Sequence, residues 1–238
     1  MKKLILSLSV LATVALFSAC TKSNNNTLAT ASVMFVNGTA GTSGSPESAK
    51  ANGTSISGAS SIAFQGASGY QNVTAGTTVD ISLVLASSGV PLGSDSILFT
   101  AGNSYSIFSG GEITSPTFVY TNDDLSAPAS GDAKIRLVNL SPDSLSLTGT
   151  LTNTSAATTS TFGSGIGRIS TSTSVSAFTS VAAGTYKLVV ADPSNFSLSV
   201  FSNSSQQINA GKIYTVIYTG TAVGSGTSAY TATVISNN

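Results

Sequence analysis

Few side chains in this 238-residue chain could carry out chemistry. The sequence contains no histidine, a single cysteine and nine acidic residues. Histidine is the usual general base of serine and cysteine hydrolases and the commonest zinc ligand, and one cysteine forms neither an intrachain disulfide nor a Cys/His metal cluster. The acids are scattered, with no spacing that favours a catalytic carboxylate pair. We therefore expect no enzymatic activity, no catalytic residues, no cofactor and no bound metal ion.

The lone thiol belongs to Cys20, which lies at the end of an apolar run near the start of the chain. Two lysines precede the run at residues 4–17, and the small residues Ser18 and Ala19 lead to Cys20. A basic start, an apolar core and a small-residue cleavage site are the parts of a secretory signal peptide. A helix that crosses a bilayer needs about 20 apolar residues, so this run is too short to span one. We predict that residues 1–19 are a signal peptide and are removed.

The four residues at the predicted cut, Phe17-Ser-Ala-Cys20, resemble the lipobox of bacterial lipoproteins. In that motif a small residue precedes a cysteine that is acylated on sulfur before signal peptidase II cuts in front of it. The resemblance implies cleavage between Ala19 and Cys20 and a lipid on Cys20. The alternative is ordinary signal peptidase I cleavage, which would leave Cys20 as an incidental thiol. Acyl chains contribute about 0.8 kcal/mol per buried CH₂, so two or three of them hold a protein on its membrane.

Residues 20–30 contain the predicted lipidated cysteine and a polar tract without apolar periodicity, which we interpret as a flexible tether. We expect an anchored protein of the bacterial cell envelope, in the outer membrane, and leave open whether it faces the periplasm or the outside. Removal of residues 1–19 leaves seven basic against nine acidic side chains. Because no basic stripe is present to neutralise phosphates, nucleic acid is excluded as a partner.

The composition predicts an all-β fold. Apolar residues make up 41% of the chain, which is enough for packed cores, whereas charged residues make up only 8%. Serine, threonine and glycine, which are poor helix formers where they cluster, must therefore cover most of the surface. After position 20 no window of eleven residues has a helical period. We expect two tandem immunoglobulin-like antiparallel β-sandwich domains.

An internal repeat supports two domains. Three blocks recur in the same order with offsets of 102, 108 and 109 residues. The matching pairs are Ala31–Asn37 with Ala133–Asn139, Tyr70–Thr77 with Phe178–Thr185, and Ala101–Ile107 with Ala210–Val216. We predict a first domain over residues 31–121, a linker over 122–131 that contains Pro128, and a second domain over 132–238.

Alternating apolar residues predict where the strands lie. The first strand of each domain, around Val33 and Ile135, alternates apolar and other residues and is expected to have one buried face. Gly76 and Gly184 stand where a backbone with positive φ would turn into the next strand. Strands are predicted at residues 79–85, 97–100, 104–108, 186–190, 197–201, 213–219 and 230–235.

The paired Ala-Gly-x-x-Tyr and Val-x-Ala-Gly-Thr motifs, the leader and a first strand that ends in Val-Asn resemble DUF4397 proteins. The phrase Asn-x-Ser-Pro-Asp, which often ends the first strand in that family, occurs at Asn139–Asp143, whereas Asn37–Gly41 lacks it. The resemblance covers residues 31–238 and is stronger in the second half. It implies a β-sandwich lipoprotein of Bacteroidetes and other bacteria, in a family whose function is unknown.

Two tyrosines and one glycine-rich segment are candidate features. Tyr105 and Tyr214 occupy equivalent repeat positions. A tyrosine in a sandwich usually buries its ring and hydrogen-bonds a backbone carbonyl, and we favour that structural role over a binding role. The segment Gly163–Gly167 could cradle a phosphate, but no helix or lysine follows it. We interpret it as a hairpin loop.

Three acids, Asp123, Asp124 and Asp132, lie close together in and beside the predicted linker. Oxygen ligands from such a loop could hold Ca²⁺, although the spacing lacks the Asp-x-Asp-x-Asp-Gly pattern of a dedicated calcium loop. We favour solvated charges over a calcium site.

These features favour a membrane-anchored, non-catalytic module of the cell envelope that binds a protein or glycan ligand or acts structurally. The alternative is a glycan-binding lipoprotein of an outer-membrane uptake system. The absence of tryptophan argues against glycan binding, because sugar faces commonly stack on exposed aromatic rings. Exposed tyrosines aligned on one sheet face would favour it.

Overall fold

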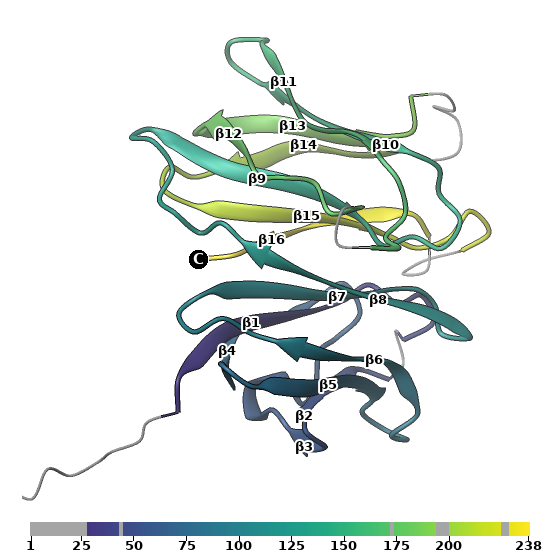
Figure 1. Cartoon of the computed structure of the whole chain (residues 1–238). Coiled ribbons are helices and arrows are strands. Elements are labelled where there is room, and N and C mark those ends of the chain that lie inside the picture. The colour runs from purple at the N-terminus through teal and green to yellow at the C-terminus, as the bar shows by residue number, and fades with distance from the viewer. Residues whose placement is uncertain (1–27, 43–44, 172–173, 194–199, 225–228) are drawn as a thin grey trace, which may run out of the picture.

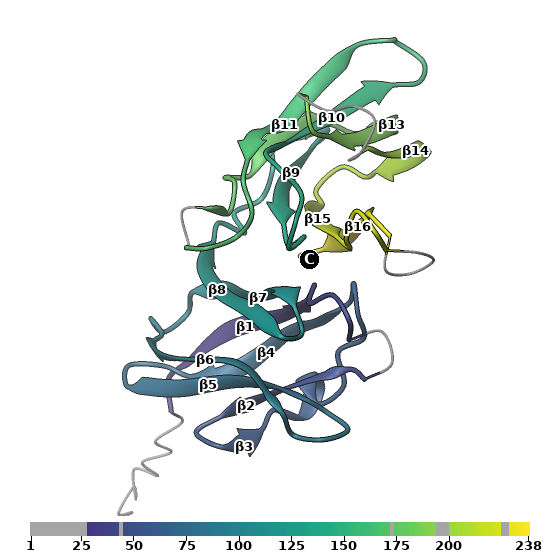
Figure 2. The same ribbon diagram turned by 90° about the vertical axis from the view of Figure 1, so that its right-hand side faces the viewer.

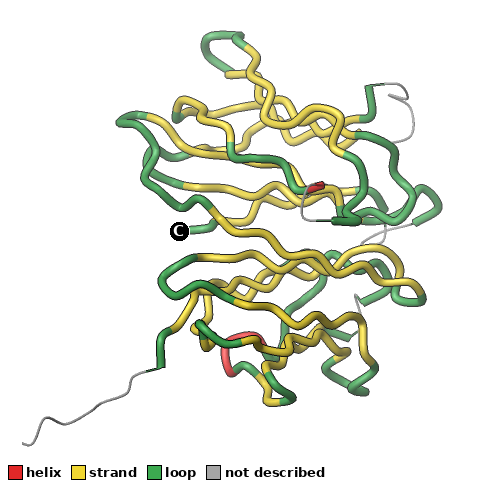
Figure 3. Tube along the Cα trace, viewed as in Figure 1, coloured by secondary structure: helices red, strands yellow, loops and turns green. Residues whose placement is uncertain are grey.

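The computed structural model describes residues 28–42, 45–171, 174–193, 200–224 and 229–238 (Figure 1). Strands dominate this part of the chain, and helical structure there is limited to short 3₁₀ turns such as η1 (Ser57–Ala59) (Figure 3). No helix in the described ranges has the length and apolar character needed to cross a membrane. The predicted signal peptide, Ala19, Cys20 and most of the tether lie outside the described residues.

The first sandwich consists of two four-stranded sheets. One has the order β4 (Ala67–Thr74), β1 (Thr30–Asn37), β7 (Ser104–Glu112), β8 (Ser115–Asp123). The other has the order β3 (Thr54–Ser55), β2 (Glu47–Ala51), β5 (Thr78–Leu85), β6 (Pro91–Leu98).

The second sandwich has the same plan. One sheet has the order β12 (Thr179–Ala182), β9 (Asp132–Asn139), β15 (Ile213–Thr219), β16 (Thr231–Ser236). The other has the order β11 (Thr159–Ile166), β10 (Leu147–Asn153), β13 (Gly184–Ala191), β14 (Val200–Ile208).

The prediction of an all-β chain with tandem sandwiches is confirmed by these four sheets. One ladder in each sandwich differs from the antiparallel expectation, because β1 runs parallel to β7 and β9 runs parallel to β15. The first strand therefore lies in the middle of its sheet, between the fourth and seventh strands. This order differs from the ABED and CFG sheets of constant immunoglobulin domains. Alternation of apolar residues indicates a buried face but carries no information about the neighbouring strand.

The repeat seen in the sequence is reproduced in the strand register. Ala31 of β1 is opposite Val73 of β4, and Ala133 of β9 is opposite Val181 of β12. The parallel ladders also correspond, since Val33 is opposite Tyr105 and Ile135 is opposite Tyr214. Each of these pairs joins two of the matched sequence blocks, so the offsets of 102, 108 and 109 residues are structural equivalences.

Each sandwich has its own apolar core between its two sheets. The first core includes Phe35, Leu83 and Phe99, and the second includes Leu137, Phe162 and Leu188, all of them fully buried. Apart from Phe99, which directly follows β6, these side chains come from strands of the two facing sheets, as expected for the inner faces of a sandwich.

Several local predictions are wrong. The segment Gly163–Gly167 is not a hairpin loop, because its first four residues form the end of β11, where Gly163 packs against the side chain of Leu137. Gly76 has the expected positive φ of 81°, whereas Gly184 has no positive φ and simply begins β13. The predicted strand at 97–100 ends at Leu98. The carbonyl of Phe99 accepts a hydrogen bond from the N–H of Gly76, which lies outside the strands.

The molecule has two distinct ends. The strands β1, β7, β9 and β15 share one direction in Figure 1, so their first residues lie at the end where the described chain begins and ends. Asn238 is held at this end, where its side chain accepts from Ile213 N and donates to Gly211 O. Asn37 and Asn139, at the last positions of β1 and β9, lie at the opposite end, which we call the distal end.

Candidate functional site

The two sandwiches pack against each other through the sheets β4-β1-β7-β8 and β12-β9-β15-β16 (Figure 2). Their facing side chains form a third apolar cluster, which we call the junction. It consists of Met34, Val36, Phe108 and Val119 from the first sandwich and Val138, Leu140, Ile169, Ile217 and Ile235 from the second. The middle strands of these sheets therefore bury both faces, as the fully buried β15 shows.

The prediction of one buried face for the first strands is wrong for this reason. Met34 and Arg136 occupy the positions expected to face solvent, and their relative exposures are 0% and 2%. The sequence shows alternation within one strand, whereas burial of the second face depends on a neighbouring domain.

An ion pair lies at the centre of the buried polar groups at the junction. The Nη1 of Arg136, in β9, donates to the Oδ1 of Asp123, at the end of β8, at 2.7 Å. The Nη2 of Arg136 donates to the Oγ of Ser106 at 3.0 Å, and that hydroxyl donates to the Oδ2 of Asp123 at 2.6 Å. The arginine and the acid come from different sandwiches, so this pair joins the two across the junction.

Further hydrogen bonds close a ring that crosses the junction twice. Arg136 Nε donates to Thr215 Oγ1 at 2.9 Å, and Thr215 donates to the Oδ1 of Asn237 at 2.8 Å. The Nδ2 of Asn237 donates to Tyr70 at 3.1 Å, and the Tyr70 hydroxyl donates to the Oδ2 of Asp123 at 2.6 Å. Burial, and then the charge of Asp123, raise the pKa of Tyr70 well above its ordinary value, so the phenol keeps the proton that it donates.

Aromatic rings enclose the guanidinium of Arg136. Its Cζ lies 4.3 Å from the ring centroid of Phe178 and 5.5 Å from that of Phe108. A planar guanidinium suits both stacking on rings and forked hydrogen bonding. The residues around Arg136 therefore pair its charge, accept a hydrogen bond from each of its three nitrogens and cover its flat faces.

The three acids of the predicted linker have separate partners. Asp123 belongs to β8 and is buried, so its interpretation as a solvated linker charge is wrong. Asp124 is exposed, and the hydrogen bond from Lys134 lowers its pKa. Asp132, in β9, accepts from Ser180. Within the described ranges no group of three histidine, cysteine or acidic residues could hold a metal ion.

The equivalent tyrosines have the structural role favoured from the sequence, with one difference. Tyr105 and Tyr214 are both buried. Each hydroxyl accepts a hydrogen bond from the backbone N–H five residues earlier, Thr100 at 3.1 Å and Asn209 at 3.2 Å, whereas a backbone carbonyl was expected as the partner. The hydroxyl thus fixes the loop that precedes β7 or β15.

Buried Asn139 organises a loop at the distal end. Its Oδ1 accepts from the N–H of Ser141 at 3.2 Å and from the Oγ of Ser144 at 2.9 Å. Its Nδ2 donates to the carbonyl of Leu145 at 3.1 Å. The amide thereby replaces the backbone partners that the loop lacks after β9 ends.

Asn37 makes the same pattern of bonds in the first sandwich. Its Oδ1 accepts from the N–H of Thr39 and from the Oγ1 of Thr42, and its Nδ2 donates to the carbonyl of Ile62. The donors to Oδ1 stand two and five residues after the asparagine in both halves. The shared feature of the two loops is therefore an asparagine followed by hydroxyl residues. Pro142 and Asp143 stand where the first half has Ala40 and Gly41.

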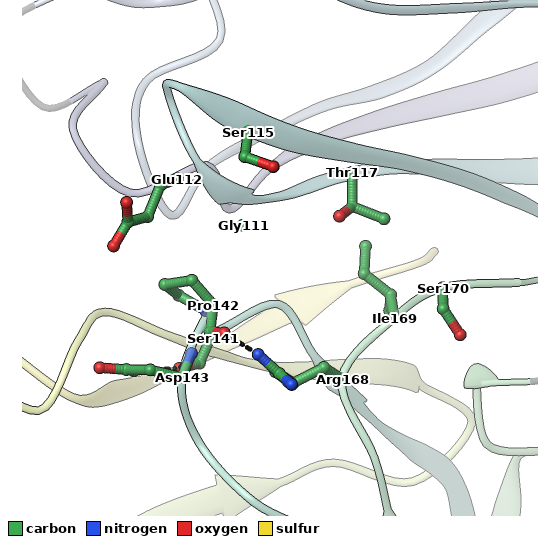
Figure 4. Close-up of a pocket in the computed structure, with 10 residues that line it drawn as sticks. All are labelled: Gly111, Glu112, Ser115, Thr117, Ser141, Pro142, Asp143, Arg168, Ile169 and Ser170. Carbon is green, nitrogen blue, oxygen red and sulfur yellow. Dashed lines mark hydrogen bonds between the residues drawn. The ribbon is translucent and has the colours of Figure 1, made fainter.

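A cleft of about 590 Å³ opens between the sandwiches at the distal end (Figure 4). The tip of the β7–β8 hairpin forms one wall, and the loops after β9 and β11 form the other. The lining residues are Gly111, Glu112, Ser115, Thr117, Ser141, Pro142, Asp143, Arg168, Ile169 and Ser170. The cleft exists because the two sandwiches are joined, since each contributes one wall.

Three charged side chains line the cleft, and none of them forms an ion pair with a residue that the structure describes. The carboxylate of Asp143 is occupied, because it accepts from Ser141, from Tyr230 and from the N–H of Ala222. Arg168 donates only to the carbonyl of Pro142 and has no ion pair among the residues that the structure describes. Glu112, on the opposite wall, is exposed and its carboxylate has neither an ion pair nor a hydrogen bond in the same ranges.

A buried acid lies behind the Asn37 loop. Glu47, at the start of β2, is fully buried, and both of its carboxylate oxygens accept from Ser109, at 2.8 and 2.7 Å. Burial raises the pKa of Glu47 to about 7, against the opposing effect of the Ser109 and Thr39 hydroxyls. The carboxyl group therefore titrates near neutral pH.

Of the site residues only Asp123 was singled out from the sequence, and its expected role as a solvated linker charge is wrong. The structure brings Arg136 together with Asp123, and it places Glu112 and Arg168 on one cleft. The phrase Asn139–Asp143 was noticed only for its resemblance. A signal that could have indicated Arg136 is its position between Ile135 and Leu137, within a predicted strand.

Comparison with known proteins supports one assignment. Residues 31–148 match the model of a family described as "Domain of unknown function (DUF4397)". The match covers the first sandwich, the linker, β9 and the Asn139 loop, and ends at the start of β10. The resemblance seen in the sequence was stronger in the second half, whereas the family model matches the first. No curated protein matches the chain.

Proposed function

We propose, from the DUF4397 match of residues 31–148 and the lipobox-like leader, that this chain is a lipid-anchored, non-catalytic binding module of a bacterial cell envelope. In this proposal Cys20 carries the lipid, residues 21–30 form the tether and the two joined sandwiches present the distal end to a ligand. The lipobox-like sequence at Cys20 is the observation that carries the proposal, because it places the only thiol of the chain at the required position.

The direction of the strands supports presentation of the distal end. The tether joins β1 at its first residue, Thr30, and the cleft lies beyond the last residues of β1 and β9. Eight residues of β1 span about 26 Å at roughly 3.3 Å per residue. The cleft is therefore at the end of the molecule opposite the proposed anchor.

The rigid connection between the two sandwiches supports a binding role. An apolar junction and a buried ion pair fix the two walls of the cleft relative to each other. Preorganised walls lower the ordering cost of binding.

The alternative proposal, a glycan ligand, is less well supported. All seven tyrosines lie in the described ranges, and each of them is buried or half-buried. The aligned exposed rings that would favour sugar stacking are therefore lacking in this part of the chain.

Fractionation of cells tests the anchoring. The full-length chain and its Cys20→Ala variant would be produced in a diderm bacterium, and inner and outer membranes would be separated on a density gradient. The native chain is expected in the outer-membrane fraction and released only by detergent, whereas Cys20→Ala, which signal peptidase II cannot process, is expected to be lost from the outer-membrane fraction. Protease treatment of intact cells then distinguishes the outer face from the periplasmic face. Outer-membrane retention of Cys20→Ala equal to that of the native chain contradicts the proposal.

A further inference from the structure

We propose that the distal cleft binds a zwitterionic ligand that carries a free ammonium group and a free carboxylate, such as an amino acid or a short peptide. The inference rests on the proposed binding function and adds the ligand class to it.

The charges of the cleft carry the inference. Glu112 lies on the wall formed by the first sandwich and Arg168 on the wall formed by the second, as Figure 4 shows. A carboxylate suits an ammonium group, and a guanidinium suits a carboxylate, which it can hold through two parallel hydrogen bonds. Because the hydrogen-bonding groups left free on the two walls are the carboxylate of Glu112 and the guanidinium of Arg168, a ligand with a single charge can pair with only one of them. A zwitterion can satisfy both.

The orientation of Arg168 leaves donors for a ligand. One of its five N–H groups is used by the carbonyl of Pro142, which holds the guanidinium at the rim of the cleft. Asp143 lies beside Pro142, but its carboxylate oxygens accept from Ser141, Tyr230 and Ala222, and it forms no ion pair with Arg168.

The rest of the lining suits a polar backbone. Ser115, Thr117 and Ser170 offer hydroxyl groups that can donate to carbonyl oxygens or accept from N–H groups. Ile169 is the one large aliphatic side chain of the lining, and it is almost fully buried in the junction. A cavity of about 590 Å³ falls within the range of roughly 300–1,000 Å³ typical of small-ligand sites.

Rigid supports hold both walls. Gly111, next to Glu112, donates its N–H to the carbonyl of Leu140 across the junction at 3.0 Å. Asn139 fixes the loop that carries Pro142. The backbone beside Glu112 and the loop that holds the guanidinium of Arg168 are thus fixed before a ligand arrives.

Calorimetric titration of the full mature chain, purified from envelopes in detergent micelles, tests the inference. The probes are triglycine, N-acetyl-triglycine, which lacks the ammonium group, triglycinamide, which lacks the carboxylate, and L-alanine. Triglycine is expected to bind, and each capped probe is expected to bind at least about tenfold more weakly, because one charged contact is lost. Binding of L-alanine equal to that of triglycine indicates a free amino acid as ligand, and tighter binding of triglycine indicates a peptide; either outcome supports the zwitterion site.

Substitutions locate the site. Glu112→Gln is expected to abolish the preference for triglycine over N-acetyl-triglycine, and Arg168→Gln is expected to abolish the preference over triglycinamide. Asp95→Asn, an exposed acid on β6 of the first sandwich, is the matched control and should bind triglycine as the native chain does. The inference is overturned if triglycine does not bind, if the capped probes bind equally well, or if both cleft variants keep native preferences. Such a failure leaves the fractionation test of anchoring unaffected.

Discussion

The guanidinium of Arg136 in β9 lies 2.7 Å from the carboxylate of Asp123 in β8, with both side chains buried between two sandwiches. The two residues are only 13 positions apart in the sequence, yet they belong to different domains. The linker that separates them, residues 124–131, therefore connects two sandwiches that are also joined by a buried ion pair and by hydrogen bonds. An ion pair of this kind requires one relative orientation of the two sandwiches, which apolar packing alone specifies less strongly.

Removal of one partner of this pair should be costly. Asp123→Asn and Arg136→Met are each expected to lower the free energy of unfolding by about 3–5 kcal/mol, because each leaves buried polar groups without their partner. The double variant should lose clearly less than the sum of the two, and urea unfolding of all four proteins measures the difference. Strictly additive losses would show that the two side chains do not interact.

The tight contact of Gly38 with Leu140 gives a second test of the junction. A Cβ on Gly38 would lie 2.3 Å from the Cδ1 of Leu140, so Gly38→Ala forces the two sandwiches apart. We expect a loss of about 1–3 kcal/mol in thermal or urea unfolding. Gly167→Ala is the control, since no atom lies within 4 Å of the added carbon and its backbone has no positive φ. Equal stability of the two variants would mean that the junction yields without cost.

Stability should depend on pH through Glu47. Its pKa is raised by burial to about 7 from an ordinary value of 4.5, so the folded state binds the proton more tightly than the unfolded state. The contribution of Glu47 to the free energy of unfolding is therefore largest below pH 4.5, falls as the pH rises towards 7 and is constant above it.

The variant Glu47→Gln removes this titration. Above pH 7 it should be more stable than the native chain by up to about 3 kcal/mol, and between pH 4.5 and 7 it should lose less stability. Urea unfolding at pH 5 and pH 8 gives both quantities, with Glu112→Gln as the control for an exposed glutamate. If the native chain and Glu47→Gln respond to pH alike, the carboxyl does not titrate in this range.

The two loop asparagines allow a matched comparison. Asn139→Ala removes the amide that fixes the cleft loop, whereas Asn37→Ala removes the equivalent amide of a loop that carries none of the cleft residues. Both should cost about 1–3 kcal/mol of stability, because buried partners are left unsatisfied. Triglycine affinity should fall only in Asn139→Ala. A loss of affinity in both variants would mean that global stability, and not the loop, controls binding.

The sequence was informative where one strand or one motif carries the signal. The repeat offsets matched the register of Ala31 with Val73 and of Ala133 with Val181, because inward alanine and valine positions must coincide in both sandwiches. The positive φ of Gly76 was likewise predictable, since the turn is local.

Features that depend on distant partners were not predictable. The strands β2, β8, β10 and β11 have weak apolar alternation, and β14 consists mainly of polar residues, so their pairing partners decide their conformation. The burial of Arg136 requires the second domain, and the cleft requires both. From the sequence Asp123 is interpreted as a linker residue. Its burial depends on Arg136 of β9, which belongs to the other sandwich.

Mass spectrometry of the N-terminal peptide from envelope-purified protein tests the central claim most directly. The claim of lipid anchoring predicts a mature chain that begins at Cys20, with a diacylglyceryl group on sulfur and no peptide from residues 1–19. A mature chain that begins elsewhere, or a Cys20 that retains an unmodified thiol, would contradict it.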